Sequence, residues 1–149
     1  MSGRPALLVS ACLLGERCKY NGGSNALDAA VLRALEARYR LVPVCPERDG
    51  GLPTPRTPSE RRGEWVLTRD GADVTEAFRR GAALALETAK REDCHLALLK
   101  ERSPSCGSGR IYDGSFTGTV ICGDGMTAEL LREQGFALYG ESAVERLLD

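Results

Sequence analysis

Short apolar runs recur along the chain and predict the strands of a parallel sheet. Residues 6–11, 41–44 and 96–99 are uninterrupted apolar runs, which is typical of strands buried on both faces. Residues 136–139 form a fourth, shorter run. Pro43 lies inside the second run, and because proline cannot donate a ladder hydrogen bond it predicts an edge strand or a strand end.

Helical periodicity fills the segments between these runs. Apolar residues recur on one helical face from 27 to 35 and from 74 to 89. Alternation of strands and helices predicts a three-layer, Rossmann-like α/β fold with a mainly parallel sheet and right-handed crossovers. Capping residues indicate where the helices begin, namely Ser24 or Asn25, Asp73 with Glu76, Thr127, and Ser142 with Glu145.

Two irregular segments, residues 49–63 and 107–125, and one short strand between them lie outside this alternation. Residues 49–63 are rich in proline and glycine, and so irregular a stretch predicts an active-site loop. Residues 65–68 predict a short strand before the Asp70-Gly71 turn. Residues 107–125 carry many glycines and predict loop or short hairpin.

Composition and charge narrow the class of protein. The chain of 149 residues, 42% hydrophobic and 28% charged, fits a single globular domain over residues 1–149. Lys plus Arg (20) nearly balances Asp plus Glu (21), so no basic field favours nucleic acid or a membrane surface, and a small molecule is the expected partner. Without a membrane segment or a secretory signal, we expect a cytoplasmic protein. Its six cysteines then indicate metal, cluster or catalytic chemistry instead of disulfides.

Three of the cysteines each follow a predicted strand. Cys12, Cys45 and Cys106 come at or just beyond the ends of the first three strands. Because ligands bind beyond the carboxyl ends of parallel strands, we expect the three thiols to meet at one site. Three thiolates without an obvious fourth ligand suit an iron-sulfur cluster with one open iron, or a catalytic zinc with one open position.

The other three cysteines carry weaker signals. Cys94 lies at the far end of the predicted sheet and Cys122 in an apolar pair, so both predict packing residues, while the role of Cys18 stays open. The single histidine, His95, precedes the third strand whereas Cys106 follows it. That separation disfavours a Cys-His nucleophile.

Polar residues near these cysteines could move protons. Glu47 lies two residues after Cys45, and Ser103 lies three residues before Cys106. A carboxylate and a hydroxyl beside one site can both take part in proton transfer. Arg56 could reach in as a donor to a substrate anion or carbonyl.

The segments that contain the three cysteines, Val9 to Gly15, Cys45 to Leu52 and Ser103 to Gly107, resemble the 2-thiouracil desulfidase-like family, and the resemblance covers nearly the whole chain. The resemblance implies a 4Fe-4S cluster held by Cys12, Cys45 and Cys106, with Glu47 and Ser103 as catalytic residues. It also implies non-redox desulfuration of a thiolated pyrimidine such as 2-thiouracil, giving the oxo-pyrimidine and sulfide. A mild departure is Lys19-Tyr20-Asn21-Gly22, where Arg-Tyr-Asp-Gly is commoner. The matching segments are Val9 to Gly15, Cys45 to Leu52, Pro55-Arg56, Gly71 to Thr75, Ser103 to Gly107 and Ile111 to Gly114.

Two other readings remain open at the level of sequence. One is a cluster or zinc protein that acts on another thio-compound or transfers its sulfur. The other is a cluster-bearing sensor or structural module without catalysis. An open iron beside a carboxylate favours an enzyme, since a purely structural cluster normally has four protein ligands.

Overall fold

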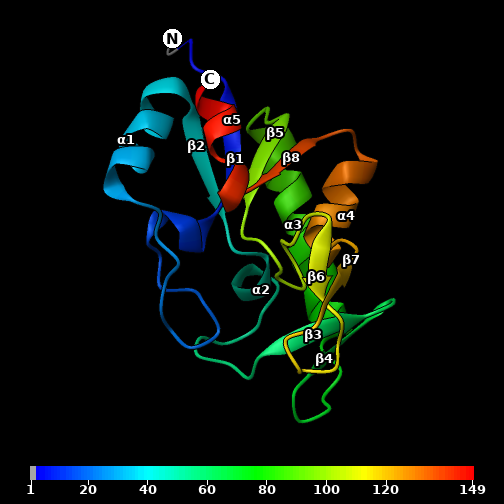
Figure 1. Ribbon diagram of the computed structural model, residues 1–149. Coiled ribbons are helices and arrows are strands. Elements are labelled where there is room, and N and C mark those ends of the chain that lie inside the picture. Colours follow the sequence, from blue (N-terminus) through cyan, green and yellow to red (C-terminus); the bar gives the residue numbers. More distant parts are fainter. Residues whose placement is uncertain (1–2) are drawn as a thin grey trace.

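The computed structural model describes residues 3–149, so residues 1 and 2 of the predicted domain lie outside it. Its centre is a four-stranded parallel sheet of order β2-β1-β5-β8 (Figure 1). The four predicted apolar runs are its strands, and Pro43 lies on edge strand β2 as predicted. The strands are β1 (Ala6–Ser10), β2 (Arg40–Val44), β5 (Leu96–Leu99) and β8 (Ala137–Gly140).

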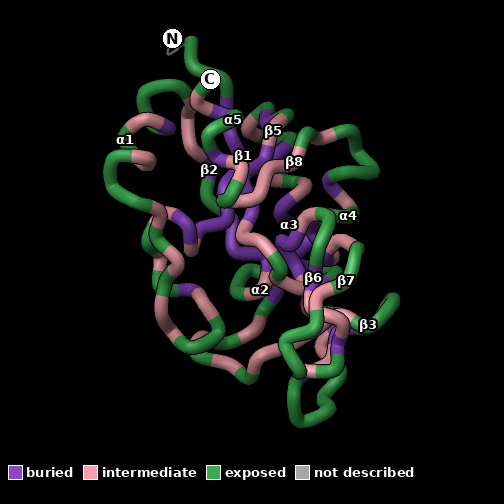
Figure 2. The backbone as a smooth tube through the Cα atoms, viewed as in Figure 1, coloured by how far each residue is buried: buried purple, intermediate pink, exposed green. Residues whose placement is uncertain are grey.

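Helices cover both faces of this sheet, which confirms the three-layer α/β prediction. Along β1, Leu8 packs with residues of α3 (Thr75–Arg91) and α4 (Met126–Glu133). Its neighbour Leu7 packs with α1 (Ala29–Arg38) and α5 (Glu145–Leu148) on the other face. Buried residues follow the strands and the inner sides of these helices (Figure 2).

Helix α1 begins later than its sequence pattern predicts. The predicted caps were Ser24 or Asn25, but the residue before the helix is Asp28. The amide of Asn25 donates to Cys12 O at 2.9 Å, and the amide of Leu27 donates to Leu13 O at 2.9 Å. These bonds hold the segment against the 3-10 turn η1 (Ala11–Leu14), so it cannot coil there.

Three other predicted caps act differently. The cap position of α4 is Gly125, and the buried Thr127 hydroxyl instead contacts Ser105 Oγ at 2.7 Å. Asp73 accepts the Thr75 amide at 2.9 Å, but Val74 holds the cap position of α3. A second 3-10 turn, η2 (Glu141–Ala143), precedes α5, and Ser142 donates to Glu101 instead of capping.

Two small antiparallel hairpins lie beyond the carboxyl ends of the central strands (Figure 1). One is β3 (Ser59–Arg62) with β4 (Trp65–Thr68), the other β6 (Arg110–Tyr112) with β7 (Val120–Cys122). Glu60 joins them by accepting the amides of Gly114 at 3.0 Å and Phe116 at 3.1 Å. The short helix α2 (Pro46–Asp49) lies between the hairpins and the sheet.

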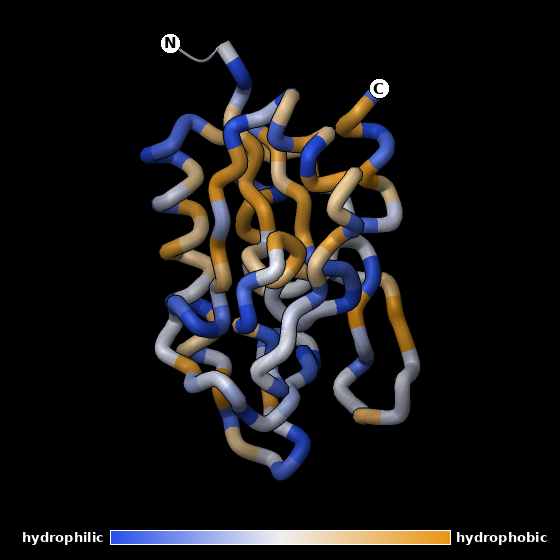
Figure 3. Tube along the Cα trace, turned by 90° about the vertical axis from the view of Figure 1, so that its left-hand side faces the viewer, coloured by the Kyte–Doolittle hydropathy of each residue, from blue (hydrophilic) through white to orange (hydrophobic). Residues whose placement is uncertain are grey.

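Hydropathy follows this division. Hydrophobic residues dominate the sheet half of the molecule, whereas the half with the loops and hairpins is more hydrophilic (Figure 3). Cys122, predicted to be a packing residue, is exposed, because it lies on a hairpin strand outside the main core. Within residues 3–149 no helix combines the length and apolar character needed to cross a membrane.

Candidate functional site

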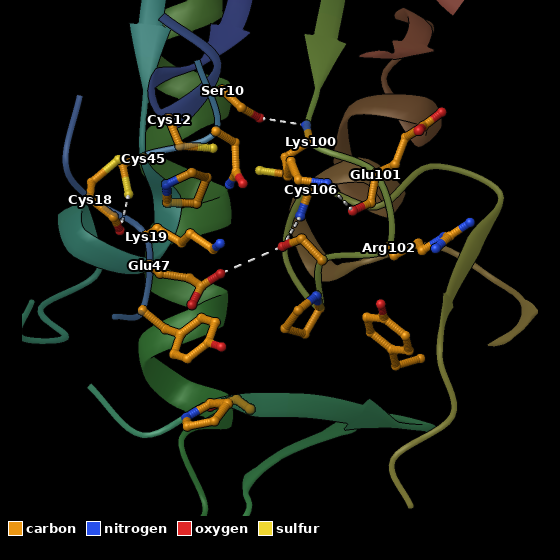
Figure 4. Close-up of a pocket in the computed structure, with 18 of the residues that line it drawn as sticks. Ser10, Cys12, Cys18, Lys19, Cys45, Glu47, Lys100, Glu101, Arg102 and Cys106 are labelled. Carbon is orange, nitrogen blue, oxygen red and sulfur yellow. Dashed lines mark hydrogen bonds between the residues drawn. The ribbon is translucent and has the colours of Figure 1, made fainter. Parts of the chain in front are cut away.

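A cavity of about 690 Å³ opens at the carboxyl edge of the sheet. The loops after β1, β2 and β5 supply Cys12, Cys45 and Cys106 to its wall (Figure 4). The structure therefore brings Cys12, Cys45 and Cys106 together, as their positions after the strands predict. The sulfurs of Cys12 and Cys106 point toward one another, while Cys45 lies beside Cys18.

Local hydrogen bonds fix the loop that carries each cysteine. Cys12 sits in turn η1, which ends at Gly15 with a left-handed φ of 98°. Cys45 immediately precedes α2, and its amide donates to the Asp49 carboxylate at 3.2 Å. Pro46 follows at the first helical position, where its fixed φ suits a helix start.

The Cys106 loop is organised around the side chain of Ser103. Its Oγ accepts the amides of Ser105 and Cys106, both at 3.1 Å. The amide of Gly107 donates to Ser103 O at 2.9 Å, and a Cβ at Gly107 would lie 2.7 Å from that oxygen. The loop after β5 is therefore tightly closed, and it aims the Cys106 side chain into the cavity.

Cys45 and Cys106 are buried, and Cys12 is partly buried. Burial raises the pKa of Cys106 and of Cys12, and the nearby thiols raise both pKa values further. Hydrogen bonds oppose this: one from Ser10 lowers the pKa of Cys106, and one from Asn25 lowers that of Cys12. Three thiolates here need a compensating positive charge, which a bound metal centre provides.

A fourth cysteine lies at the same cavity. Cys18, whose role the sequence leaves open, is buried and packs against Ala11 and Cys45. The Cys45 thiol donates to Cys18 O at 3.8 Å. Among residues 3–149, no group of three His, Cys, Asp or Glu side chains has the arrangement that a single metal ion needs.

Cys94 and His95, the other cysteine and the histidine considered above, do not line the cavity. Cys94 is buried in the core just before β5 begins, and its amide donates to Ala89 O at 2.8 Å, which confirms it as a packing residue. His95 is exposed and contacts Asp93 at 3.1 Å, on the side of the sheet where β5 begins.

Glu47, Ser103 and Arg56 form one partly buried polar group. Arg56 Nε lies 3.1 Å from Glu47 Oε1, and the Ser103 hydroxyl donates to Glu47 Oε2 at 3.5 Å. Burial raises the pKa of Glu47, while Arg56 and then Ser103 lower it. Arg56 also donates to Cys18 O at 2.8 Å and Thr54 Oγ1 at 3.0 Å, so its guanidinium holds Glu47 in place.

Three further residues, Lys100, Tyr112 and Phe116, line the cavity although the sequence does not predict them as site residues. Lys100 follows β5 directly, and its ammonium pairs with Glu141 at 2.7 Å. Tyr112 and Phe116 of the β6–β7 hairpin also line the cavity. Lys100 could have been found as the first polar residue after a buried strand, but no pattern marks the hairpin residues.

The chain is similar to known proteins over most of its length. A family profile described as 2-thiouracil desulfurase matches residues 7–143. The "Uncharacterized protein YbbK" of Bacillus subtilis (strain 168) is 43% identical, over 95% of this chain and 99% of its own. A solved structure of the [4Fe-4S]-dependent thiouracil desulfidase TudS is 49% identical with a TM-score of 0.92, over 97% of this chain and 95% of that one. The chain belongs to the 2-thiouracil desulfurase family.

Proposed function

We propose that this protein is a [4Fe-4S]-dependent desulfidase that converts a thiolated pyrimidine such as 2-thiouracil into the oxo-pyrimidine and sulfide. The observation that carries the proposal is one cavity lined by three strand-end cysteines and a partly buried carboxyl-hydroxyl pair. The 49% identity to a protein named as a [4Fe-4S]-dependent thiouracil desulfidase supports it.

Cys12, Cys45 and Cys106 would hold the cluster. All three are free thiols, and they lie on separate loops around the cavity. Their burial also fits, because neighbouring buried thiolates are stable only beside positive charge. When bound, a cluster with three protein thiolates leaves one iron open to the substrate's sulfur and supplies Lewis acidity without net electron transfer.

Glu47 acts as the base in this proposal. Its carboxylate takes a proton from the water that attacks the thiocarbonyl carbon. Arg56, 3.1 Å from Oε1, favours the ionised carboxylate in a buried setting and fixes its orientation. Without this partner, burial would favour the protonated acid, which cannot accept a proton.

Ser103 completes the path of the proton. Its Oγ accepts two amides, which leaves its own proton free to point to Glu47 Oε2. The hydroxyl can therefore orient the Glu47 carboxylate, and it can turn its proton to the substrate instead. Overall, one water gives its oxygen to the pyrimidine carbon, both of its protons leave with the sulfur as H₂S, and no electrons are exchanged.

Aromatic side chains suit the ring of the substrate. Tyr112 of β6 and Phe116 of the turn between β6 and β7 line the cavity. Flat apolar faces of this kind favour a planar heterocycle by stacking. Binding of the ring there would leave its thiocarbonyl directed to the cysteines.

The test combines metal analysis with turnover on the same preparations. Wild-type protein reconstituted anaerobically should hold iron and acid-labile sulfide and convert 2-thiouracil to uracil. Cys12→Ser, Cys45→Ser and Cys106→Ser should each lose iron and turnover together, since a hydroxyl replaces a thiolate ligand poorly. Cys94→Ser and Cys122→Ser are the controls and should keep both. Full iron in Cys106→Ser, or no uracil from cluster-loaded wild type, would overturn the proposal.

A further inference from the structure

The turn between β6 and β7 carries Phe116 at the cavity, and the other hairpin holds this turn in place. Glu60 of β3 accepts the amides of Gly114 at 3.0 Å and Phe116 at 3.1 Å, both through the same oxygen, Oε1. Amide bonds to a carboxylate are charge-assisted and stronger than neutral ones. One side chain of the β3–β4 hairpin therefore anchors a turn that lies 54 to 56 positions further along the chain.

The backbone of this turn needs such an anchor. Phe116 has a φ of 58°, a left-handed conformation that a residue with a side chain keeps only where its surroundings hold it. Gly114 has a φ of 96°, and a Cβ there would lie 1.9 Å from Arg62 Cγ. The turn is thus pressed against β3, and the bonds to Glu60 hold Phe116 in its unfavourable conformation.

The β3–β4 hairpin also contacts the aromatic ring itself. The guanidinium of Arg69, the residue after β4, lies over the Phe116 ring at 5.6 Å from its centre. The amide of Arg69 donates to Pro58 O at 3.0 Å, so the backbone that carries this cation is fixed as well. A cation is attracted to one face of a ring, which leaves the opposite face for a planar ligand. Glu60, Arg69 and Phe116 all line the cavity.

We propose that Glu60 is a positioning residue for substrate binding, whose carboxylate holds the β6–β7 turn so that the Phe116 ring stacks on the pyrimidine. The inference rests on the proposed function only in that the substrate is a planar pyrimidine. Glu60 itself contacts neither the substrate nor the cluster in this proposal. Its whole effect on affinity therefore passes through Phe116.

Four variants separate this role from a general effect on the hairpin. Glu60→Ala removes the acceptor of both amides, whereas Glu60→Gln keeps an acceptor oxygen on a side chain of the same size and is the rescue variant. Phe116→Ala removes the ring. Glu64→Ala is the matched control, because Glu64 is an exposed glutamate in the turn of the same β3–β4 hairpin and does not line the cavity.

The experiment uses cluster-loaded protein prepared anaerobically. It measures the Kd of uracil, the expected product, which the enzyme does not consume, together with KM and kcat for 2-thiouracil and the iron content. Phe116→Ala should raise Kd and KM by about 5- to 100-fold, the usual contribution of stacking a base on an aromatic ring. Glu60→Ala should raise both by at least about 5-fold, while Glu60→Gln and Glu64→Ala stay close to wild type. Iron and kcat should not change, since stacking acts equally on the ground and transition states.

The decisive comparison is the double variant of Glu60→Ala with Phe116→Ala. If Glu60 acts through the ring, the double variant should bind uracil no more weakly than Phe116→Ala alone. The same fold-change from Glu60→Ala with and without the ring, or a wild-type Kd in Glu60→Ala, would overturn the inference. Wild type that converts no 2-thiouracil would refute the proposed function, and the uracil Kd would still test Glu60. Wild type that neither converts 2-thiouracil nor binds uracil would refute both.

Discussion

At the scale of single residues, Glu47 shows how a buried carboxyl group is kept usable. Burial raises the pKa of Glu47, and Arg56 and Ser103 together oppose that effect. Glu16, in contrast, lies outside this group and pairs with Arg48 at 3.0 Å. Opposed influences of this kind are common where a carboxyl group transfers protons.

Replacing Glu47 by glutamine should separate proton transfer from metal binding. Glu47→Gln keeps the size of the side chain and part of its hydrogen bonding but removes the base. We expect full iron content and turnover lower by about 10² to 10⁴, the usual contribution of general acid-base catalysis. Iron and uracil formation are measured on one preparation, with Glu16→Gln as the control. Turnover per cluster near that of wild type would exclude Glu47 as the base.

The sequence predicts some site residues better than others. The cysteines, Glu47 and Ser103 are found because strand ends meet at one edge and both polar residues lie within three positions of a cysteine. The bond between Ser10 and Lys100 joins residues 90 positions apart, so only the observed strand order shows it. The pairing of Arg56 with Glu47 likewise depends on the path of an irregular loop.

At the scale of elements, helices α2 and α3 touch backbone to backbone. A Cβ at Gly81 would lie 1.9 Å from Pro46 O, and a Cβ at Gly50 would lie 2.2 Å from Ala77 O. Only glycine fits at these two contacts, so α3 fixes the position of α2. Since Cys45 precedes α2 and Glu47 lies in it, this packing also positions the site.

Gly81→Ala should therefore weaken both the fold and the metal site. Helix propensity alone predicts that this change stabilises α3 by about 1 kcal/mol. Contact with the Pro46 carbonyl should reverse the sign and cost about 1 to 3 kcal/mol, as overpacking does. Urea unfolding and iron content check this, with Ala83→Gly on the exposed face of α3 as the control for propensity. A Gly81→Ala protein more stable than wild type would contradict the contact.

The start of α3 offers a pH-dependent test. Asp73 accepts the Thr75 amide at 2.9 Å and its hydroxyl at 2.6 Å, which lowers the pKa of Asp73 below its ordinary 3.8. A lowered pKa in the folded state adds stability above pH 3.8 that is lost as the pH falls through the folded-state value. Asp73→Asn should thus have a lower urea midpoint than wild type at pH 7, and the gap should narrow in acid. Asp28→Asn is the control, because Asp28 makes no side-chain cap bond.

Element boundaries were harder to predict than the elements themselves. The apolar runs predict the strands. The start of α1, however, depends on hydrogen bonds from residues 25 and 27 to η1, and the local sequence around the helix does not reveal these bonds. In the same way, Thr127 looks like a cap in sequence and is instead a buried partner of Ser105. Tertiary hydrogen bonds determine both the start of α1 and the position of the Thr127 side chain, and sequence spacing does not reveal such bonds.

At the scale of the whole molecule, the core and the site are supported separately. Two apolar clusters pack on opposite faces of the sheet, and most of their members lie away from the cavity. The fold should therefore persist when the metal centre is removed, with changes restricted to the loops that would hold it.

Removal of the cluster should thus loosen loops without unfolding the sheet. We expect chelator-treated protein to keep its far-UV circular dichroism and to unfold at a lower temperature. Amide exchange should become faster in the loops around Cys12, Cys45 and Cys106 and stay slow in β1 and β5. Global loss of protection would show that the core needs the cluster. Peptides from α3 serve as the internal reference.

The two small hairpins are built apart from the sheet that supplies the cysteines. They share no ladder with it, and the Glu60 carboxylate joins them to each other. The β6–β7 hairpin meets the Cys106 loop at the bridge between Arg102 and Ile111, so a replacement hairpin would have to keep that junction. Protein engineers could graft a different β6–β7 hairpin onto this scaffold to admit bulkier thio-heterocycles while every cysteine loop keeps its native sequence.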